Sequence, residues 1–340
     1  MSAHAQFPAR RLTPAGRFGA AAAAGGALAV CCLGAVEVFW RVRGGAPSVD
    51  DSPALWALAA ARAPAGDPDV LALVGTSRMH SGFDPAVWRA RFPGRPAVQL
   101  AIAGKSPFPV LRRLAGDGAF VGLAVVGITE EHLGRAAPAD LPHTRRPAPR
   151  SWGERAATRL TAFVDSLLTV ASSRVGWYQV QRGLRAGRGF GGATYAFMDA
   201  DRWRRNEYAR TDVAARRAES ERSLRKAVDG SVDPAAWLAG ADIYAATARR
   251  IADRGGRVAF VRMPTAGPCR ALLANRCPRG RFWDRFAARL GGGPSVTAIH
   301  FEDVPGMRGL SIPDWSHLDA ADRPAFTRAL LDELARRGLL

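Results

Sequence analysis

The sequence predicts an α/β fold, in which a five-stranded parallel sheet lies between two layers of helices. Short, wholly apolar runs follow one another along the chain, and stretches with helical periodicity separate them. Strands that are apolar on both faces are typical of parallel sheets covered by helices on both sides. Right-handed crossovers then give a three-layer, doubly wound domain. The predicted strands are residues 70–74, 97–101, 120–128, 258–263 and 296–301.

Turn residues bound the predicted strands. The first strand lies between Asp-Pro-Asp and Gly75, the second ends at Ile-Ala-Gly-Lys-Ser, and the third is the most hydrophobic of the five. We assign residues 50–134 to the first part of this domain and 231–340 to the second. The predicted helices are residues 85–91, 234–254, 281–290 and 319–337.

Residues 18–40 form an apolar run whose only ionisable side chain, apart from two thiols, is Glu37. As a helix this run would be about 34 Å long, which is enough to cross the hydrocarbon core of a bilayer. We therefore predict a transmembrane anchor at 18–40 and a tail at 1–17. A cleaved signal peptide is the competing interpretation, but Pro47 would follow the small residues that a cleavage site needs.

The charges around this run favour a cytoplasmic tail. Arg10, Arg11 and Arg17 precede it, whereas Arg41 and Arg43 follow it and are themselves followed by two aspartates. Positive charge is enriched on the cytoplasmic side of membrane helices. This slight asymmetry predicts a single-pass protein of the inner membrane, with its body outside the cytoplasm, in the periplasm.

The formal net charge of +18 comes almost entirely from arginine, since Lys105 and Lys226 are the only lysines. Together with the abundance of Ala and Gly, this bias is typical of a GC-rich genome. The sequence contains no basic stripe interleaved with aromatic residues and no recognisable nucleic-acid-binding module. We therefore expect no nucleic-acid partner.

Residues 135–230 differ in character and are predicted to form a helical insertion. A linker rich in Pro and Arg comes first, then apolar residues at helical spacing, and a charged helix ends the segment. The insertion is either a helical elaboration whose charges face solvent or a cap over an active-site cleft. If the insertion is a cap, four of its aromatic residues would stack on sugar rings; if it is an elaboration, they would pack against the protein. These residues are Trp177, Tyr178, Tyr195 and Trp203.

Cys269 and Cys277 bracket a short segment after the fourth predicted strand. An extracytoplasmic body would permit a disulfide between them, whereas the cytosol would keep both thiols reduced. The sequence does not give their Cα separation, so both alternatives stay open.

Three polar loops are expected to meet at the carboxyl edge of the sheet, where ligands bind in such folds. Ser77 stands in the loop after the first strand, from which a nucleophile can reach a cleft; its alternative role is a helix N-cap. A nucleophilic serine needs a base, and the base needs an orienting partner. Asp314 and His317, three residues apart before the last predicted helix, offer both.

In these residues the chain resembles the SGNH/GDSL hydrolases, in particular the membrane-anchored bacterial branches that process cell-surface polysaccharides. In that superfamily a Gly-x-Ser segment follows the first strand, and a late Asp-x-x-His motif precedes the final helix. The segments Gly75-Thr76-Ser77 and Asp314-Trp315-Ser316-His317 match in order and context. The resemblance covers residues 70–134 and 258–334, and it implies a flavodoxin-like sheet and a triad of Ser77, His317 and Asp314.

The resemblance also implies an oxyanion hole that includes backbone N–H groups near Ser77 and Gly104. The superfamily adds the Asn of a Gly-x-Asn-Asp block, and Thr129 stands at that place here, in Gly127-Ile128-Thr129-Glu130. A hydroxyl can still donate, but from a shorter arm, and one lost donor costs roughly 10²- to 10³-fold in rate. Arg78 is either a solvated turn residue or an anchor that binds an anionic group of the substrate.

Two functions follow from these residues. The first is a membrane-anchored serine esterase or O-acyltransferase that acts on an acylated glycan or small ester. The second is a catalytically weak SGNH-like protein that binds glycan or a protein partner in an envelope assembly. The set of Ser77, Asp314 and His317 favours the first, and Thr129 favours the second. No cofactor or metal is expected, since the histidines and carboxylates match no closed zinc pattern.

Overall fold

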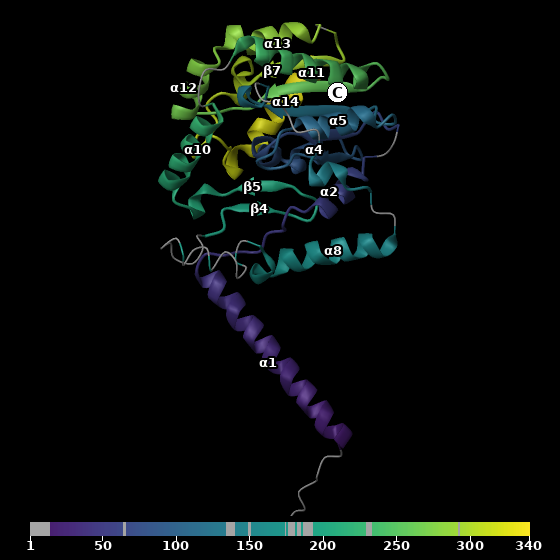
Figure 1. Ribbon diagram of the computed structural model, residues 1–340, viewed down its shortest axis with the longest axis vertical. Coiled ribbons are helices and arrows are strands. Elements are labelled where there is room, and N and C mark those ends of the chain that lie inside the picture. The colour runs from purple at the N-terminus through teal and green to yellow at the C-terminus, as the bar shows by residue number, and fades with distance from the viewer. Residues whose placement is uncertain are drawn as a thin grey trace, which may run out of the picture.

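The computed structural model describes residues 14–340, except 64–65, 134–139, 149–150, 174, 176–180, 182–184, 186–192, 229–232 and 292. It has a long N-terminal helix, α1, which projects from a body built around one parallel sheet (Figure 1). The order of the strands is β2-β1-β3-β6-β7, and every neighbouring pair is parallel. These strands confirm the predicted α/β fold class: β1 Leu71–Val74, β2 Ala97–Gln99, β3 Leu123–Ile128, β6 Arg257–Arg262 and β7 Val296–His300.

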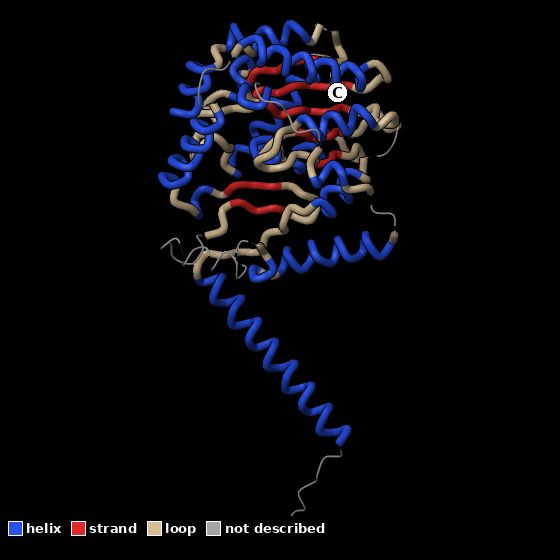
Figure 2. The backbone as a smooth tube through the Cα atoms, in the orientation of Figure 1, coloured by secondary structure: helices blue, strands red, loops and turns tan. Residues whose placement is uncertain are grey.

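Helices cover both faces of this sheet, which makes three layers (Figure 2). Because successive side chains of a strand point to opposite faces, each strand contributes to two cores. Ala72 and Val74 pack under one layer, and Leu71 and Leu73 pack under the other. The first layer contains α2 Pro53–Ala60, α5 Phe108–Gly116, α11 Pro234–Ala252 and α13 Trp283–Arg289. The second contains α3 Ser77–Gly82, α4 Pro85–Arg91 and α14 Arg323–Arg336.

The starts of several helices follow from capping residues in the sequence. Asp84 accepts a hydrogen bond from the N–H of Ala86 and precedes a proline at the first position of α4. Asp233 does the same for α11, again before a proline. These two helices begin where the sequence predicts. The remaining elements of the body are α6 Glu130–Leu133, α12 Gly267–Arg276, η2 Tyr208–Arg210, η3 Arg279–Arg281, η4 Phe301–Asp303, η5 Pro305–Met307 and η6 Ala320–Asp322.

The segment between β3 and α11 contains the predicted helices and also a small sheet that the sequence does not predict. Its helices are α7 Pro142–Arg145, α8 Trp152–Leu167 and α10 Val213–Ala227, with a short turn η1 Thr169–Ala171. Strands β4 Ala196–Met198 and β5 Arg204–Asn206 form an antiparallel pair. The insertion is therefore mixed rather than purely helical.

Contacts with the main domain explain this hairpin. Arg202, in the left-handed region with φ 66°, is fully buried and binds Asp51 through two hydrogen bonds of 2.9 and 2.8 Å. Its guanidinium also donates to the carbonyls of Gln99 and Ala101. Trp203 packs in the same core as α14, stacked on Phe83 with 5.9 Å between ring centroids. Long-range contacts of this kind leave no periodic signal in the local sequence.

Helix α1 spans Pro14–Val42, and its apolar part, Phe18–Val42, is long and apolar enough to cross a membrane. It is the one such helix in the described part of the chain. Most of its described side chains are exposed, and the helix projects away from the body (Figure 1). Cys269 and Cys277 are both buried but belong to different apolar clusters, the first with Leu224 and Leu273, the second in the core under the sheet.

Candidate active site

The carboxyl ends of β1 and β3 lie side by side, since Val74 pairs with Val126 in the parallel register. Ser77 is the first residue of α3, three residues after the last residue of β1, and Thr129 directly follows β3. Thr76, with an extended backbone, is the N-cap residue between strand and helix. The fold therefore brings these two loops together, as the strand order requires.

His317 lies between Ser77 and Asp314. Its Nε2 is 2.7 Å from Ser77 Oγ, and its Nδ1 is 2.8 Å from Asp314 Oδ2. A carboxylate only accepts, so Nδ1 carries the proton and Nε2 is left to accept from the serine hydroxyl. Because 240 positions separate Ser77 from His317, only the tertiary fold can make this contact.

Asp314 is buried and held as a carboxylate. Burial by itself would favour its neutral form, but hydrogen bonds from His317, Tyr208 and the Ser316 backbone outweigh burial, so the pKa of Asp314 lies well below its usual value. Its other oxygen accepts the backbone N–H groups of Ser316 (2.9 Å) and His317 (2.7 Å). Tyr208 also interacts with Asp314, and burial and the negative charge of this carboxylate raise the pKa of Tyr208.

A tight turn at Trp315 makes this arrangement possible. Trp315 has a φ of 66°, in the left-handed region, which is unusual for a residue with a side chain. Its N–H bonds to the carbonyl of Ile312, and its own carbonyl accepts from Ala266. Its indole lies against Gly267, where a Cβ would come within 2.7 Å of the ring. Strain stored in one turn thus aims Asp314 and His317 at each other.

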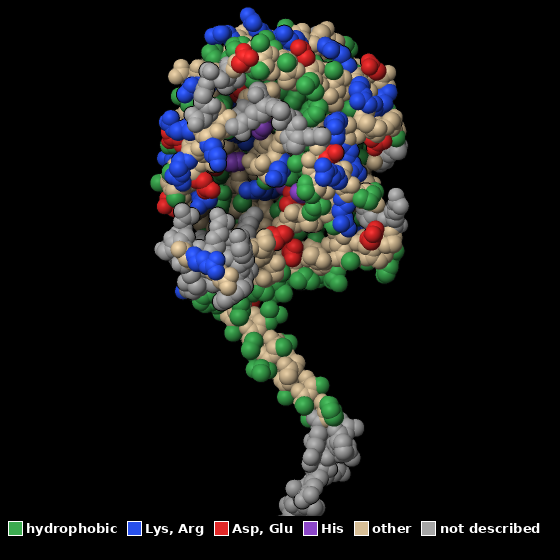
Figure 3. All heavy atoms as spheres, in the orientation of Figure 1, with side chains coloured by type: hydrophobic (Ala, Val, Ile, Leu, Met, Phe, Trp, Pro, Cys, Tyr) green, Lys and Arg blue, Asp and Glu red, His purple; other side chains and the backbone are tan. Residues whose placement is uncertain are grey.

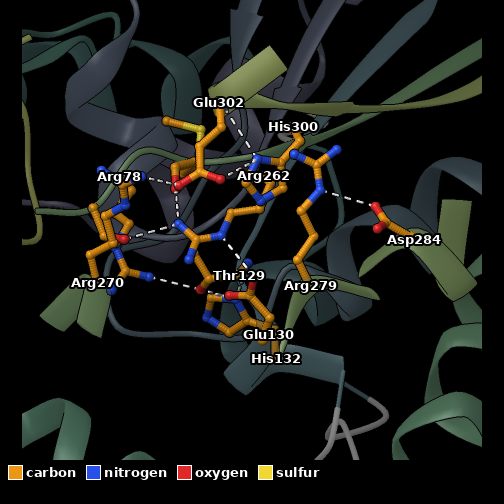
Figure 4. A network of polar contacts seen from close by, with 12 residues as sticks. Arg78, Thr129, Glu130, His132, Arg262, Arg270, Arg279, Asp284, His300 and Glu302 are labelled. Atoms are coloured by element: carbon orange, nitrogen blue, oxygen red, sulfur yellow. Dashed lines mark hydrogen bonds and ion pairs between the residues drawn. The ribbon is translucent and has the colours of Figure 1, made fainter. Parts of the chain in front are cut away.

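Arg78 links the serine loop to the loop that carries Ser316 and to the loop that carries Thr129, whose contact with Arg78 Figure 4 includes. Its Nη1 donates to Thr129 Oγ1 at 2.8 Å, and its Nε lies 3.2 Å from both the carbonyl and the hydroxyl of Ser316. Thr129 is only 1% exposed. Its N–H and its hydroxyl both lie 3.2 Å from His132 Nδ1. Since the N–H makes Nδ1 an acceptor, the hydroxyl proton also points at His132.

A buried ion pair lies at this edge of the sheet, between the loop after β3 and the end of β6. Glu130 and Arg262, which are 5% and 4% exposed, are 2.9 Å apart (Figure 4). Arg262 also donates to Thr265 Oγ1 at 3.1 Å, and the Glu130 carbonyl accepts from the indole of Trp237 at 2.8 Å. Removing one partner of a buried pair is strongly destabilising. The pair therefore holds the loop after β3 in place.

A cavity of about 660 Å³ opens over Ser77 and His317, and α10 forms its wall on the opposite side. Gly104, with φ +70°, lines it together with Arg78, whereas Thr129 lies behind Arg78. Ser220 of α10 reaches Asp314 Oδ2 at 3.4 Å. Its lining includes several hydroxyl and basic groups, among them Thr76, Lys105, Ser106, Arg216, Ser220 and Ser223. Basic side chains are prominent on this face of the molecule (Figure 3).

The other histidine close to Ser77 in sequence does not belong to this cavity. His80, which the sequence suggests is an exposed residue at a helix start, is 1% exposed, and its Nε2 is 2.8 Å from the carbonyl of Arg202. Of the four aromatic residues considered above, Tyr195 lines the cavity and Trp203 packs in the core. Trp177 and Tyr178 lie outside the described residues.

Sequence reasoning did not find Trp315, Tyr208 or Ser220, which surround Asp314. The only sequence signal for Trp315 is its place inside the Asp-x-x-His segment. Tyr208 and Ser220 come from the insertion, and nothing in their local sequence connects them with a residue about 100 positions later. Among the described residues, no group of three or more His, Cys, Asp or Glu side chains is arranged to hold a metal ion.

No protein-family model matches the chain, and no curated protein is significantly similar to it. Among solved structures, it aligns with a crystal structure of TesA at 14% sequence identity and a TM-score of 0.35. The alignment covers 79% of this chain and 99% of that one. A likeness this weak supports no conclusion about function, which has to be argued from the site itself.

Proposed function

We propose that the chain is a membrane-anchored serine esterase or O-acyltransferase of the SGNH type. The observation that carries this proposal is the hydrogen-bonded series from Ser77 through His317 to Asp314. In it His317 takes the proton of Ser77 as the hydroxyl oxygen attacks the acyl carbon, and ionised Asp314 stabilises the imidazolium that forms. The alcohol of the ester then leaves with that proton, and the acyl group stays on Ser77.

The second half of the reaction decides between hydrolysis and transfer. Water or a sugar hydroxyl attacks the acyl-enzyme, gives its proton to His317 and releases Ser77. The cavity over Ser77, about 660 Å³, is large enough for a small glycan unit. Its hydroxyl and basic side chains suit the hydroxyl groups of a sugar, and this supports an acylated glycan as the substrate.

The negative oxygen of the tetrahedral intermediate needs donors. We assign this role to backbone N–H groups near Ser77 and Gly104, with Thr129, the third residue of the predicted oxyanion hole, acting indirectly. Because the Thr129 hydroxyl proton points at His132, Thr129 acts chiefly by holding Arg78 against the cavity. The Arg78 guanidinium then brings a fixed positive charge to the place where the acyl oxygen develops its charge.

Anchoring through α1 completes the proposal. The segment Phe18–Val42 would be about 37 Å long as a helix, which exceeds the thickness of a bilayer core. Its flanking charges support an inner-membrane location with the body in the periplasm. A reporter that needs export, fused after Leu340, should then be active, and activity of a reporter that works only in the cytoplasm would contradict this orientation.

The second candidate is a catalytically weak protein that binds glycan. The specific observation in its favour is the replacement of an amide donor by Thr129, which is buried and already hydrogen-bonded. The two candidates differ in whether Ser77 reacts.

A fluorophosphonate probe separates them. The full chain in detergent should form a covalent adduct that peptide mapping places on Ser77, and Ser77→Ala should abolish it. Ser166→Ala, an exposed serine of α8, is the matched control and should label normally. Turnover of p-nitrophenyl acetate should fall by about 10³-fold or more in Ser77→Ala and in His317→Ala, and the double variant should lose little more. No adduct on Ser77 would leave the binding role.

A further inference from the structure

Helix α8 turns its apolar side away from the protein. The side that faces the body carries Ala162 and Asp165, which are buried, and Asp165 accepts a hydrogen bond from the N–H of Asp50 at 3.3 Å. Ala162 packs with Leu55 in a small cluster. The large apolar side chains of α8 are exposed instead: Trp152 81%, Leu160 63%, Phe163 57%, Leu167 50% and Val164 37%.

The spacing of these side chains puts them on one face. At about 100° per residue, the five fall within an arc of about 120°, and Ala162 and Asp165 lie on the opposite side of the helix. A surface helix of a soluble protein normally buries such an arc in its core. Here the arc forms an apolar strip along the base of the body (Figure 3). Exposed apolar patches of this kind mark sites of contact with membranes or proteins.

Hydrogen bonds attach the end of α8 to the end of α1. Arg41 of α1 donates from Nη2 to the carbonyl of Leu167, the last residue of α8, at 2.9 Å. The carboxylate of Glu37 accepts the N–H groups of Thr169 (2.9 Å) and Val170 (3.0 Å) in the turn that follows. Helix α8 therefore ends beside the last turns of α1 and runs across the direction of α1, at the side of the body from which α1 leaves (Figure 1).

We propose that α8 lies in the surface of the membrane that α1 crosses, with its apolar face among the lipid acyl chains. This inference rests on the proposed anchoring through α1 and is independent of the catalytic proposal. From Phe18 to Glu37, α1 is about 29 Å long, close to the thickness of the hydrocarbon core. Residues 37–41 thus lie where acyl chains give way to headgroups, and α8 is fixed at this depth.

The composition of α8 fits that position. An interfacial helix carries large apolar residues on one face and basic residues beside it. Arg155 and Arg159 are exposed next to the apolar arc, where lipid phosphates would lie. A single crossing helix lets a body pivot, whereas a second, perpendicular contact holds it in one orientation. The proposal therefore gives the cavity over Ser77 a fixed direction relative to the membrane.

Spin labels on the full chain in lipid nanodiscs test this. Cys31 and Cys32 are replaced by alanine, and one new cysteine carries the nitroxide. Cys269 and Cys277 are 1% and 2% exposed and should stay unlabelled. Labels at Leu160→Cys and Phe163→Cys examine the apolar face. Thr161→Cys is the matched control on the polar side of α8, and Asp253→Cys, exposed after α11, is the control in water. Leu28→Cys reports on α1.

The measurement is the collision rate of each label with oxygen, which concentrates in lipid, and with a water-soluble nickel chelate. Labels at 160, 163 and 28 should favour oxygen over nickel several-fold more than labels at 161 and 253. If position 28 favours oxygen while 160 and 163 behave like 253, α8 lies in water and the inference fails, although the anchor stands. Labels at 160 and 163 that neither reagent reaches would indicate a protein partner and would also overturn it. Nickel contact at position 28 would refute the anchor itself, and with it the placement of α8.

Discussion

Lowering the pH from 7 to 5 should destabilise the fold, because His80 is buried as a neutral imidazole in the folded protein. A carbonyl only accepts hydrogen bonds, so the 2.8 Å contact with the Arg202 carbonyl requires the proton on Nε2. Burial and, next, the charge of the Arg202 guanidinium lower the pKa of His80 from 6.5 to about 3. A second proton on this ring would therefore be strongly unfavourable in the folded state.

The size of the effect follows from the two pKa values. Below pH 6.5 the unfolded chain binds a proton on His80 that the folded chain does not bind until about pH 3. The contribution of His80 to stability is thus complete above pH 6.5 and is lost as the pH falls. Between pH 7 and pH 5 the loss is about 2 kcal/mol. His300, whose pKa burial and Arg262 also lower to about 3, adds a similar loss.

Urea unfolding of the full chain in detergent at pH 7, 6 and 5, followed by tryptophan fluorescence, measures this loss. His80→Gln is the informative variant, because its side-chain N–H can replace Nε2–H toward Arg202 but does not titrate. The wild type should lose about 2 kcal/mol more than the variant between pH 7 and pH 5. All other titrating groups affect both proteins alike and cancel. Equal losses would refute a neutral, buried His80.

Three further outcomes are expected. Trp203→Ala should lower the free energy of unfolding by about 3–5 kcal/mol in the same urea assay, since the ring is buried in the core. Gly267→Ala should lower turnover about tenfold or more with the fold retained, because its Cβ displaces the Trp315 indole. Gly255→Ala also puts a side chain at a positive φ but meets no atom within 4 Å, and it should keep full turnover. Arg78→Lys should lower kcat roughly tenfold, because one ammonium cannot replace a guanidinium that bonds two loops.

The main sheet could be predicted because its strands are apolar on both faces. Residues 71–74 of β1 are all buried, and such a run has few alternatives to a central parallel strand. The helix starts at Asp84 and Asp233 were equally predictable, since a cap and a proline are local signals. The hairpin around Arg202 was not, because that residue adopts its strained backbone only in return for contacts with Asp51 and Ala101 far away in the sequence.

The residues of the candidate site also divide into those with a local sequence signal and those that depend on long-range contacts. Ser77, Asp314 and His317 stand in short motifs at the ends of elements, so topology alone places them at one edge of the sheet. Their catalytic role stays a prediction until the serine is shown to react. One wall of the cavity comes from α10, whose charged sequence is equally compatible with a helix in solvent. The apolar residues of α8 have the spacing of a helix that packs into a core. The sequence therefore could not show that this face is exposed.

The hydrogen bond that Thr129 accepts from Arg78 explains this residue better than a role as a direct donor in place of asparagine. An amide at that position could donate directly to an oxyanion, whereas the Thr129 hydroxyl, 1% exposed, accepts from Arg78 and is shared with His132. In the proposed mechanism, Thr129 therefore supports a charged donor, Arg78, where an amide would itself be a neutral donor. Since a charged donor stabilises a developing oxyanion about twice as strongly as a neutral one, the exchange is compatible with an active hydrolase. The amide donor and Arg78 are then alternative solutions to the same electrostatic requirement.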